Sequence, residues 1–560
     1  MLRRLLMKTG STPGGPPLDI PLSGVTVFVG PNNSGKSRAL SEIEQWLRNA
    51  NPPPGLVVKS VEFEPWSATA IKDILDILKI DPTDGESVGT NHVIIETLNA
   101  QTNAMFRSQI NRQALEREAQ NPGAYRNNYV TLLSLFTLKL DGKNRLALSE
   151  SQPAGDLQKT APNHLAKLFV ANDLRARLRQ IVFEAFGKYL VIDPTNIGHL
   201  RLRLSSRAPV DEREEKGWDS VAQAFHRLAV PIESASDGVK AFVGMLSTII
   251  AGNPRITLID EPEAFLHPTL SARLGKEVAV AMGATDRRLF VSTHSASFLM
   301  GCILAGAPVN IVRLTYDYEV ATARLLARDK LMPLMRHPLL RSVGVLNALF
   351  HSAVVVTESD ADRSYYQEIN ERLVSANDIR GIPGCLFLNA QNKQTVWKIV
   401  KPLRGLGIPA AGIVDIDVLK EGGAVWKKPL EGAFIPELSH PGLQADRKAL
   451  LDAFVASGKD MKRDGGLEIL TEGGRETCRG LFAKLAAYGV FVVANGELES
   501  WMPSLGVSKN KATWLVSMFE RLGDDPTKAE YVRPETGDVW EFIGLVKKWV
   551  SDPNRLGIPT

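Results

Sequence analysis

Short runs of apolar, often β-branched residues alternate with amphipathic stretches in the first 345 positions of this 560-residue chain. Buried strands read as continuous apolar runs, whereas surface helices repeat apolar residues every three or four positions. The predicted strands lie at 24–29, 256–259, 289–292 and 311–315, and the predicted helices at 38–47 and 269–282. This β-α-β order predicts an α/β fold with a parallel sheet.

The same pattern begins again near position 345. Predicted strands lie at 353–357, 385–388, 411–414 and 490–493, predicted helices at 363–374 and 395–403, and a helical tail at 512–522 and 539–550. A chain of this length exceeds what one hydrophobic core can bury. The restart therefore predicts two α/β domains, at 1–345 and 346–560.

The segment at about 60–210 lacks this alternation and is interpreted as a helical insertion in the first domain. A helix is expected at 71–80, and a long amphipathic helical stretch at 163–190. Residues 129–138 and 144–148 are interpreted as two paired strands, because the turn-forming pair Asp141-Gly142 lies between them.

The first predicted strand runs into Gly30-Pro31-Asn32-Asn33-Ser34-Gly35-Lys36-Ser37, which fits the phosphate-binding pattern GxxxxGK[ST] directly before a helix. Backbone N–H groups of such a loop surround phosphates. Lys36 would neutralise phosphate charge, and Ser37 would ligate Mg²⁺. The expected ligand is ATP, and the expected binding residues are Gly30, Asn32, Asn33, Ser34, Gly35, Lys36 and Ser37.

Two carboxylates follow the apolar run at 256–259. Asp260 is expected to hold the Mg²⁺ shell, and Glu261 to orient or deprotonate the attacking water. His294 follows the next strand and is positioned to reach the γ-phosphate. Upstream of these residues, Ser236 and Gly238 begin a predicted helix, whose first N–H groups can contact a phosphate.

Carboxylates also end the strands of the second series. Glu358 follows the strand at 353–357, and Asp415 and Asp417 follow the strand at 411–414. Like charges gathered at neighbouring strand ends repel one another and need a divalent cation, and hard oxygen ligands suit Mg²⁺ or Mn²⁺. The other candidate metal ligands are Asp362 and Glu499, with Asp360 as an alternative to Asp362.

Asp-Glu-Pro-Glu-Ala-Phe-Leu-His-Pro at 260–268, with Ser-Thr-His-Ser at 292–295, resembles the ABC ATPases of the OLD (overcoming lysogenization defect), RecF and SMC-like group. In ABC ATPases the signature segment, here Ser236-Asp237-Gly238, contacts the ATP of a second protomer, which implies a homodimer or higher homo-oligomer. The match is partial, because the full signature is Leu-Ser-Gly-Gly and no Q-loop glutamine is assigned between 50 and 130.

The strand with Glu358 and the strand with Asp415-Ile416-Asp417 resemble the Toprim domain of topoisomerases, primases and OLD nucleases. The spacing of Glu358 and Asp362, and Gly496-Glu497-Leu498-Glu499, resemble OLD nucleases in particular. The resemblance implies that these carboxylates bind two metals for phosphodiester cleavage. It also implies a dimerisation insert and a late catalytic lysine, for which Lys547 and Lys548 are candidates.

The function implied by the resemblance is an ATP-dependent, metal-dependent DNA endonuclease of antiphage defence. DNA is the implied substrate, and a helicase or another defence-system protein is a candidate partner. One alternative is an SMC-like DNA-binding ATPase with a non-catalytic Toprim domain. Another is a Toprim primase or topoisomerase, although the nearby tyrosines, Tyr365 and Tyr366, fall on a predicted helix.

Composition adds the setting. The 66 basic and 62 acidic residues give a net charge of +4, without a polybasic tail. Cys302, Cys385 and Cys478 have no CxxC spacing, which argues against a zinc site and a disulfide scaffold. The apolar run at the N-terminus is too short for a secretory signal, and no stretch reaches the roughly 18 apolar residues of a membrane span. A cytoplasmic protein without membrane contact is expected.

Overall fold

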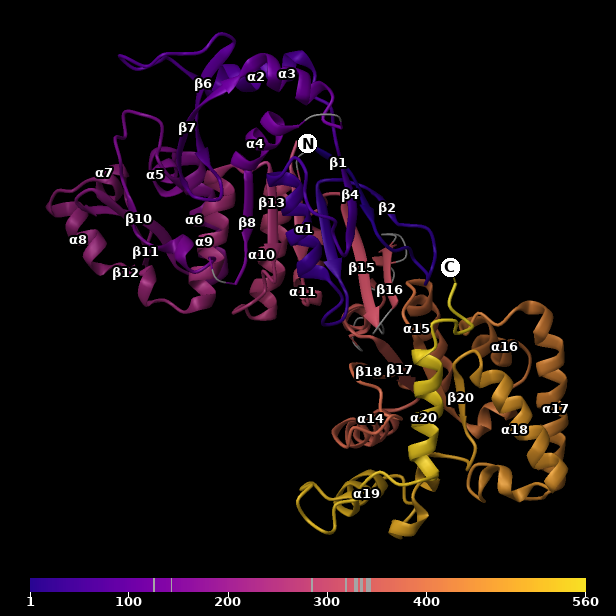
Figure 1. Ribbon diagram of the computed structural model, residues 1–560. Coiled ribbons are helices and arrows are strands. Elements are labelled where there is room, and N and C mark those ends of the chain that lie inside the picture. Colours follow the sequence, from indigo (N-terminus) through magenta and orange to yellow (C-terminus); the bar gives the residue numbers. More distant parts are fainter. Residues whose placement is uncertain are drawn as a thin grey trace.

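The computed structural model describes residues 1–123, 126–142, 144–283, 286–317, 320–326, 331–332, 336–338 and 344–559. Two α/β bodies follow one another along the chain, the first in indigo to salmon and the second in orange to yellow (Figure 1). The first is built on a six-stranded sheet and the second on a four-stranded sheet.

The six-stranded sheet contains the strands predicted in the first series. Its order is β16 (Val320–Leu326), β15 (Val309–Asp317), β3 (Val25–Val29), β14 (Arg288–Ser292), β13 (Ile256–Asp260) and β8 (Thr137–Leu140). Neighbouring strands are parallel except β15 and β16. The helices packed around it are α1 (Lys36–Arg48), α9 (Asp237–Gly252), α10 (Pro268–Met282) and α11 (Ala296–Leu304).

Strand β3 shows why these runs are continuously apolar. Val27 and Val29 belong to the core shared with α9, α10 and α11, whereas Phe28 belongs to the core on the α1 side. All five residues of β3 are buried. A parallel sheet covered on both faces requires apolar residues at every position.

Three small antiparallel sheets surround this centre. The first is β2 (Asp19–Pro21), β1 (Leu2–Met7) and β4 (Val58–Phe63); the second is β5 (Lys79–Ile80), β6 (His92–Asn99) and β7 (Ala104–Asn111); the third is β10 (Tyr189–Asn196), β11 (His199–Ser205) and β12 (Val230–Pro231), with β9 (Gln152–Pro153) paired to β11. The accompanying helices are α2 (Ala68–Leu78), α3 (Arg112–Gln120), α4 (Asn127–Leu135), α5 (His164–Val170), α6 (Asn172–Phe186), α7 (Glu212–Lys216) and α8 (Ser220–Leu228).

The insertion predicted as helical at about 60–210 contains strands as well as helices. It contributes β5, β6 and β7 to one small sheet and β9, β10 and β11 to another, and it also contains β8, which pairs with β13 in the six-stranded sheet. The expected strand at 129–138 is wrong, because Tyr129, Leu132 and Leu133 are buried on one side of helix α4. Their spacing of three and four residues is that of a helix, not of a strand.

The other strand of the predicted pair is also wrong, because residues 144–148 form no strand but lead into a 3₁₀ turn, Ala147–Ser149. The helical stretch predicted at 163–190 is present as two helices, because Ala171 is extended between α5 and α6, and Gly187 ends α6 with φ of 65°. Tyr189 already belongs to β10.

The second body is a parallel sheet in the order β18 (Cys385–Asn389), β17 (Ala353–Thr357), β19 (Ala410–Asp415) and β20 (Val490–Val493). Val354 and Val356 pack in the core that includes α15, whereas Ala353 and Val355 pack in the core that includes α14 and α20. Its helices are α14 (Asp360–Ser375), α15 (Lys393–Gly405), α16 (Gly423–Gly432), α17 (His440–Ala456), α18 (Glu472–Ala486), α19 (Trp514–Leu522) and α20 (Asp538–Ser551). No helix in the described residues is long and apolar enough to cross a bilayer.

Candidate nucleotide and metal sites

The P-loop leaves β3 and enters α1, as its sequence predicts. Gly30 has φ of 146°, and a Cβ atom there would lie 2.0 Å from the carbonyl oxygen of Leu314 in β15. Asn33 and Gly35 also have positive φ, of 61° and 91°. The loop therefore depends on backbone conformations that favour glycine and asparagine.

Lys36 is held inside this loop. Its Nζ donates hydrogen bonds to the carbonyl oxygens of Gly30 at 2.9 Å and Pro31 at 2.7 Å. Burial lowers the pKa of Lys36 to about 8, and the carboxylates of Glu261 and Asp260 oppose this shift. An ammonium whose bonds are to backbone carbonyls is available to a phosphate that enters the loop.

Ser37 and Asp260, the two residues expected to share a magnesium ion, lie in contact. The hydroxyl of Ser37 donates to Oδ1 of Asp260 at 2.9 Å. Strand β14 lies between β3 and β13, and all three are parallel, so the P-loop and Asp260 occur at the same edge of the sheet. The structure thus brings together the residues of the predicted nucleotide site.

Glu261 and His294 lie beside each other at this edge. Nε2 of His294 is 3.6 Å from Oε1 of Glu261. Burial and then Lys36 lower the pKa of His294, so the neutral imidazole is favoured. Glu263, which was not among the predicted site residues, accepts hydrogen bonds from the backbone N–H of His294 at 2.6 Å and from the hydroxyl of Thr293 at 2.8 Å. It fixes the loop that carries the histidine.

Arg145 holds the backbone of the carboxylate pair, and it was not among the residues predicted from the sequence. Its Nη1 and Nη2 donate to the carbonyl oxygens of Glu261 and Asp260, each at 2.6 Å. Its side chain is almost completely buried, with 1% exposed. Glu261 has φ of 49°, a left-handed conformation that is rare for a residue with a side chain. The two hydrogen bonds stabilise this backbone conformation.

Ser236 and Gly238 lie at the start of α9. A Cβ atom at Gly238 would lie 2.6 Å from the carbonyl oxygen of Phe265, so the helix packs closely on the segment after the carboxylate pair. Among the described residues, no hydrogen bond or ion pair joins Ser236 or Gly238 to the P-loop. Within the described part of the chain, the start of α9 is therefore not bonded to the P-loop.

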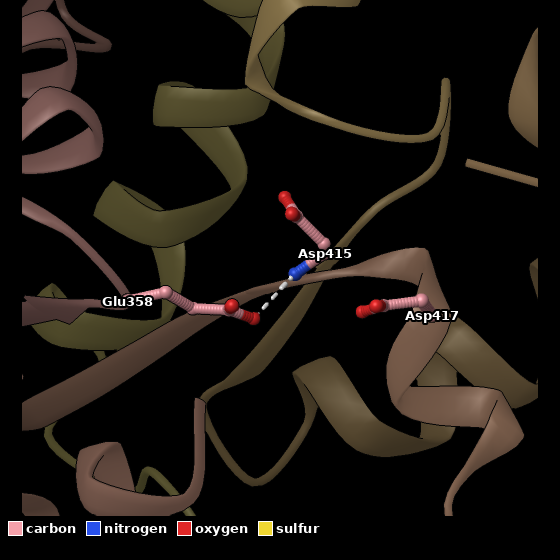
Figure 2. A group of neighbouring side chains, drawn as sticks. All are labelled: Glu358, Asp415 and Asp417. Carbon is pink, nitrogen blue, oxygen red and sulfur yellow. Dashed lines mark hydrogen bonds between the residues drawn. The ribbon is translucent and has the colours of Figure 1, made fainter. Parts of the chain in front are cut away.

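In the second body, Glu358, Asp415 and Asp417 form one acidic group. Each offers a carboxylate oxygen within 4.8 Å of the others. Figure 2 shows the side chains of Glu358 and Asp417 directed towards each other, with Glu358 accepting a hydrogen bond of 3.0 Å from the backbone N–H of Asp415. The adjacent parallel strands β17 and β19 place these residues at one sheet edge.

The protonation of this group is strongly perturbed. Burial and, after it, the charge of Asp415 raise the pKa of Glu358 to about 8. Burial raises the pKa of Asp415 to about 7, although Lys462 opposes the shift. Oδ1 of Asp417 is buried without a hydrogen-bond partner among the described residues. These features fit a divalent cation with oxygen ligands.

Two lysines contact the acidic group, and neither was predicted. Nζ of Lys462 lies 2.5 Å from Oδ2 of Asp415 and 3.7 Å from Oδ2 of Asp417. Nζ of Lys393 lies 3.3 Å from Oδ2 of Asp417. The candidates Lys547 and Lys548 lie on α20 and form no ion pair with these carboxylates in the described part of the chain. The late-lysine assignment therefore does not fit this geometry.

Asp362 and Glu499 lie outside the three-residue group but close enough for their charges to act on each other. Asp362 caps α14 through hydrogen bonds from the N–H and hydroxyl of Ser359. Burial raises the pKa of both Asp362 and Glu499. Asp360 is instead paired with Arg363 at 2.8 Å.

Tyr365 and Tyr366 are fully buried in the core against α20. The hydroxyl of Tyr366 accepts a hydrogen bond of 2.9 Å from Nε1 of Trp501, and burial raises the pKa of both tyrosines. A covalent topoisomerase reaction requires a tyrosine hydroxyl that DNA can reach. The burial of both side chains argues against that alternative.

The family model described as "AAA domain, putative AbiEii toxin, Type IV TA system" matches residues 159–300. This range contains α9, β13, β14 and His294. The chain contains an AAA-type ATPase domain. The P-loop that completes this ATPase domain lies outside the matched range and joins it through the pairing of β3 with β14.

Solved structures of SMC head domains are also similar. The SMC head domain from Thermotoga maritima is 13% identical, with a TM-score of 0.29, and covers 58% of this chain and 99% of its own. An SMC head bound to the C-terminal winged-helix domain of ScpA is 15% identical, with a TM-score of 0.33, and covers 59% of this chain and 99% of its own. No curated protein matches the sequence.

Proposed function

We propose that this chain is an ATP-regulated, metal-dependent DNA endonuclease of the OLD type, in which 346–560 is a Toprim nuclease domain. The observation that carries the proposal is the acidic group of Glu358, Asp415 and Asp417 at the carboxyl edge of a parallel sheet. Their ligand oxygens lie within 4.8 Å of one another, and burial together with the charge of Asp415 raises the pKa of Glu358.

Glu358, Asp415 and Asp417 would hold Mg²⁺ or Mn²⁺, and Asp362 and Glu499 would complete a neighbouring metal position. A divalent cation there would neutralise the scissile phosphodiester and activate water. Lys462 would exchange its ion pair with Asp415 for one with a phosphate oxygen, because its ammonium lies within reach of two of the acids. Lys462, instead of Lys547 or Lys548, is the lysine we assign to charge stabilisation.

The ATPase domain would regulate cutting. ATP with Mg²⁺ would bind Gly30, Asn32, Asn33, Ser34, Gly35, Lys36, Ser37 and Asp260 of one protomer and Ser236 and Gly238 of the next. Glu261 would activate the attacking water, and His294 would sense the γ-phosphate. Since no hydrogen bond or ion pair in the described residues joins the signature to the P-loop of the same chain, a homodimer is the simplest complete form. We place this enzyme in the cytoplasm, in antiphage defence, with a helicase or similar protein as a candidate partner.

A second candidate is a DNA-binding ATPase whose C-terminal body does not cut. One observation favours it: Lys462 already forms a short ion pair with Asp415, in the position that a cation would neutralise. The two proposals differ in whether a divalent ion displaces this ammonium.

Asp415→Ala distinguishes them. In the nuclease, this change should abolish nicking of supercoiled plasmid in Mg²⁺ or Mn²⁺ while ATP hydrolysis remains within about twofold of wild type, because the P-loop lies in the other body. Glu358→Ala and Asp417→Ala should behave in the same way, and Asp360→Ala is the matched control. Nicking by Asp415→Ala at the wild-type rate would refute the nuclease proposal.

A further inference from the structure

Lysines stand around a hollow beside the acidic group, and the rest of its exposed lining is mostly apolar. A cavity of about 330 Å³ lies between α15 and α16, and its lining includes Trp397, Lys398, Lys401 and Lys428. A smaller adjoining hollow shares Trp397 and Lys428 and adds Lys393. The two hollows together form what we call the lysine groove: Lys393, Trp397, Lys398, Lys401 and Lys428.

One end of the lysine groove reaches the acidic group. Lys393 lies at the start of α15, and its ammonium is 3.3 Å from Asp417 and 2.7 Å from Glu421. From there α15 carries the groove away from the carboxyl edge of the sheet. One end of a linear ligand bound along the groove would therefore lie beside Asp417.

The charges along the groove are suited to a polyanion. Lys398 and Lys401 are exposed and form no ion pair among the described residues. Nζ of Lys428 contacts only the amide oxygen of Gln394, at 3.4 Å, in the hydrogen bonds of the described residues. Glu431 is the one acid in the lining of the larger cavity. The four lysine ammonium groups thus lie beside three carboxylates, Glu431, Glu421 and Asp417, and the last two are both paired with Lys393.

The spacing along the groove also fits a nucleic-acid backbone. Lys393 and Lys401 are eight residues apart in sequence, which corresponds to about 12 Å of helix at 1.5 Å per residue. One DNA strand carries a phosphate about every 3.4 Å along the duplex axis, so this length covers about three or four phosphates. The side chain of Trp397 is buried and closely packed: a Cβ atom at Gly412 would lie 2.7 Å from its ring, and one at Gly432 would lie 2.8 Å from its Cβ.

We propose that the lysine groove binds the backbone of double-stranded DNA and directs it to the acidic group. The role of directing DNA to the acidic group rests on the proposed nuclease function, whereas DNA binding by the groove does not depend on it. Contacts to phosphates hold the register of a strand without reading its sequence. The groove therefore predicts DNA binding that is independent of sequence and strongly dependent on salt.

The test uses the full chain with Lys398→Gln and Lys401→Gln combined. Binding of a fluorescent 30-base-pair duplex is measured by anisotropy from low to moderate salt in Ca²⁺. Each lost phosphate contact lowers the slope of log K against log salt by about 0.9, so the double variant should lose a slope of about 1.8 and bind roughly tenfold more weakly. The matched control is Lys448→Gln with Lys459→Gln, two exposed lysines that do not line the groove.

A second substrate separates binding from chemistry. Bis(p-nitrophenyl) phosphate is too short to occupy the lysine groove, but its hydrolysis in Mn²⁺ would still need the acidic group. The groove variant should therefore hydrolyse it at the wild-type rate. If wild type hydrolyses neither substrate but the salt slopes differ as expected, the groove stands and the nuclease proposal fails. An unchanged slope, an equal loss in the control variant, or tighter binding of duplex RNA than of DNA would overturn the groove proposal.

Discussion

Single residues at the two sites combine chemistry with backbone support. The side chains of Lys36, Ser37 and Asp260 could be predicted because their motif fixes both residue type and spacing. Arg145 could not, because its contribution is to donate hydrogen bonds to two carbonyl oxygens that lie 115 and 116 residues away. Neither its charge nor its neighbours in sequence indicate such a partner. Long-range bonds to backbone leave no local pattern.

Arg145 leads to a prediction about ATP hydrolysis. Arg145→Met keeps much of the volume but removes the bonds to Asp260 and Glu261, so the left-handed backbone at Glu261 is no longer held. We expect kcat to fall about 10- to 100-fold, or about 1.4 to 2.7 kcal/mol of activation free energy, with little change in KM. Steady-state ATPase assays and nucleotide binding measure the two effects. Arg145→Lys should recover part of kcat, and a rise in KM alone would contradict the prediction.

The acidic group leads to a prediction about pH. Burial raises the pKa of Glu358 to about 8 and of Asp415 to about 7, so the folded protein holds these protons more tightly than the unfolded chain does. Without metal, the stability contributed by the protonated carboxyls is therefore present at low pH and is lost as the pH rises through these values. A divalent cation replaces the protons, so its binding strengthens over the same range.

Mg²⁺ should consequently raise Tm more at pH 8 than at pH 6. A concentration of one hundred times Kd corresponds to about 2.7 kcal/mol of stabilisation at the higher pH. Thermal unfolding without nucleotide, in Mg²⁺ or EDTA, measures this difference, and Glu358→Gln is the control that should lose most of it. The same shift at both pH values would count against a cation bound by these acids.

At the scale of elements, the parallel strands were predictable and the insertion was not. Strands β3, β13, β14, β17 and β19 are buried on both faces, so their sequences are continuously apolar. In α4 the apolar residues are so frequent that a strand and a helix are hard to distinguish from their spacing. The packing of Tyr129 and Leu133 in the core, which the sequence does not reveal, is what favours the helix. The lysines at the acidic group come from a loop and a helix start, for which no motif was available.

The contact between β3 and β15 gives a test at this scale. Gly30→Ala would place a Cβ atom 2.0 Å from the Leu314 carbonyl in β15, so backbone must move. We expect a loss of about 2 to 3 kcal/mol in unfolding free energy together with weaker ATP binding. Gly142→Ala is the matched control, because a Cβ atom there meets no heavy atom within 4 Å. Denaturant unfolding measures both, and equal stability of the two variants would contradict the assignment.

For the whole molecule, the proposed nucleotide site combines the P-loop of one chain with the signature segment of a second. Lys36→Ala removes the phosphate-binding ammonium, and Ser236→Arg blocks the signature, so each variant alone should lack ATPase activity. In a mixed dimer, one site combines both changes and the other combines neither. An equimolar mixture should therefore recover about a quarter of the wild-type rate if subunits exchange freely. No recovery after exchange, confirmed by light scattering of tagged dimers, would argue for a site completed within one chain.

Strand β8 has a consequence for how this protein can be divided. It lies inside the insertion by sequence, yet it is the outermost strand of the sheet that holds Asp260, and it leads to Arg145. The insertion is therefore not a removable cassette. Excision of 60–210 as a whole would leave β13 as an open sheet edge, ready to pair with other chains and aggregate.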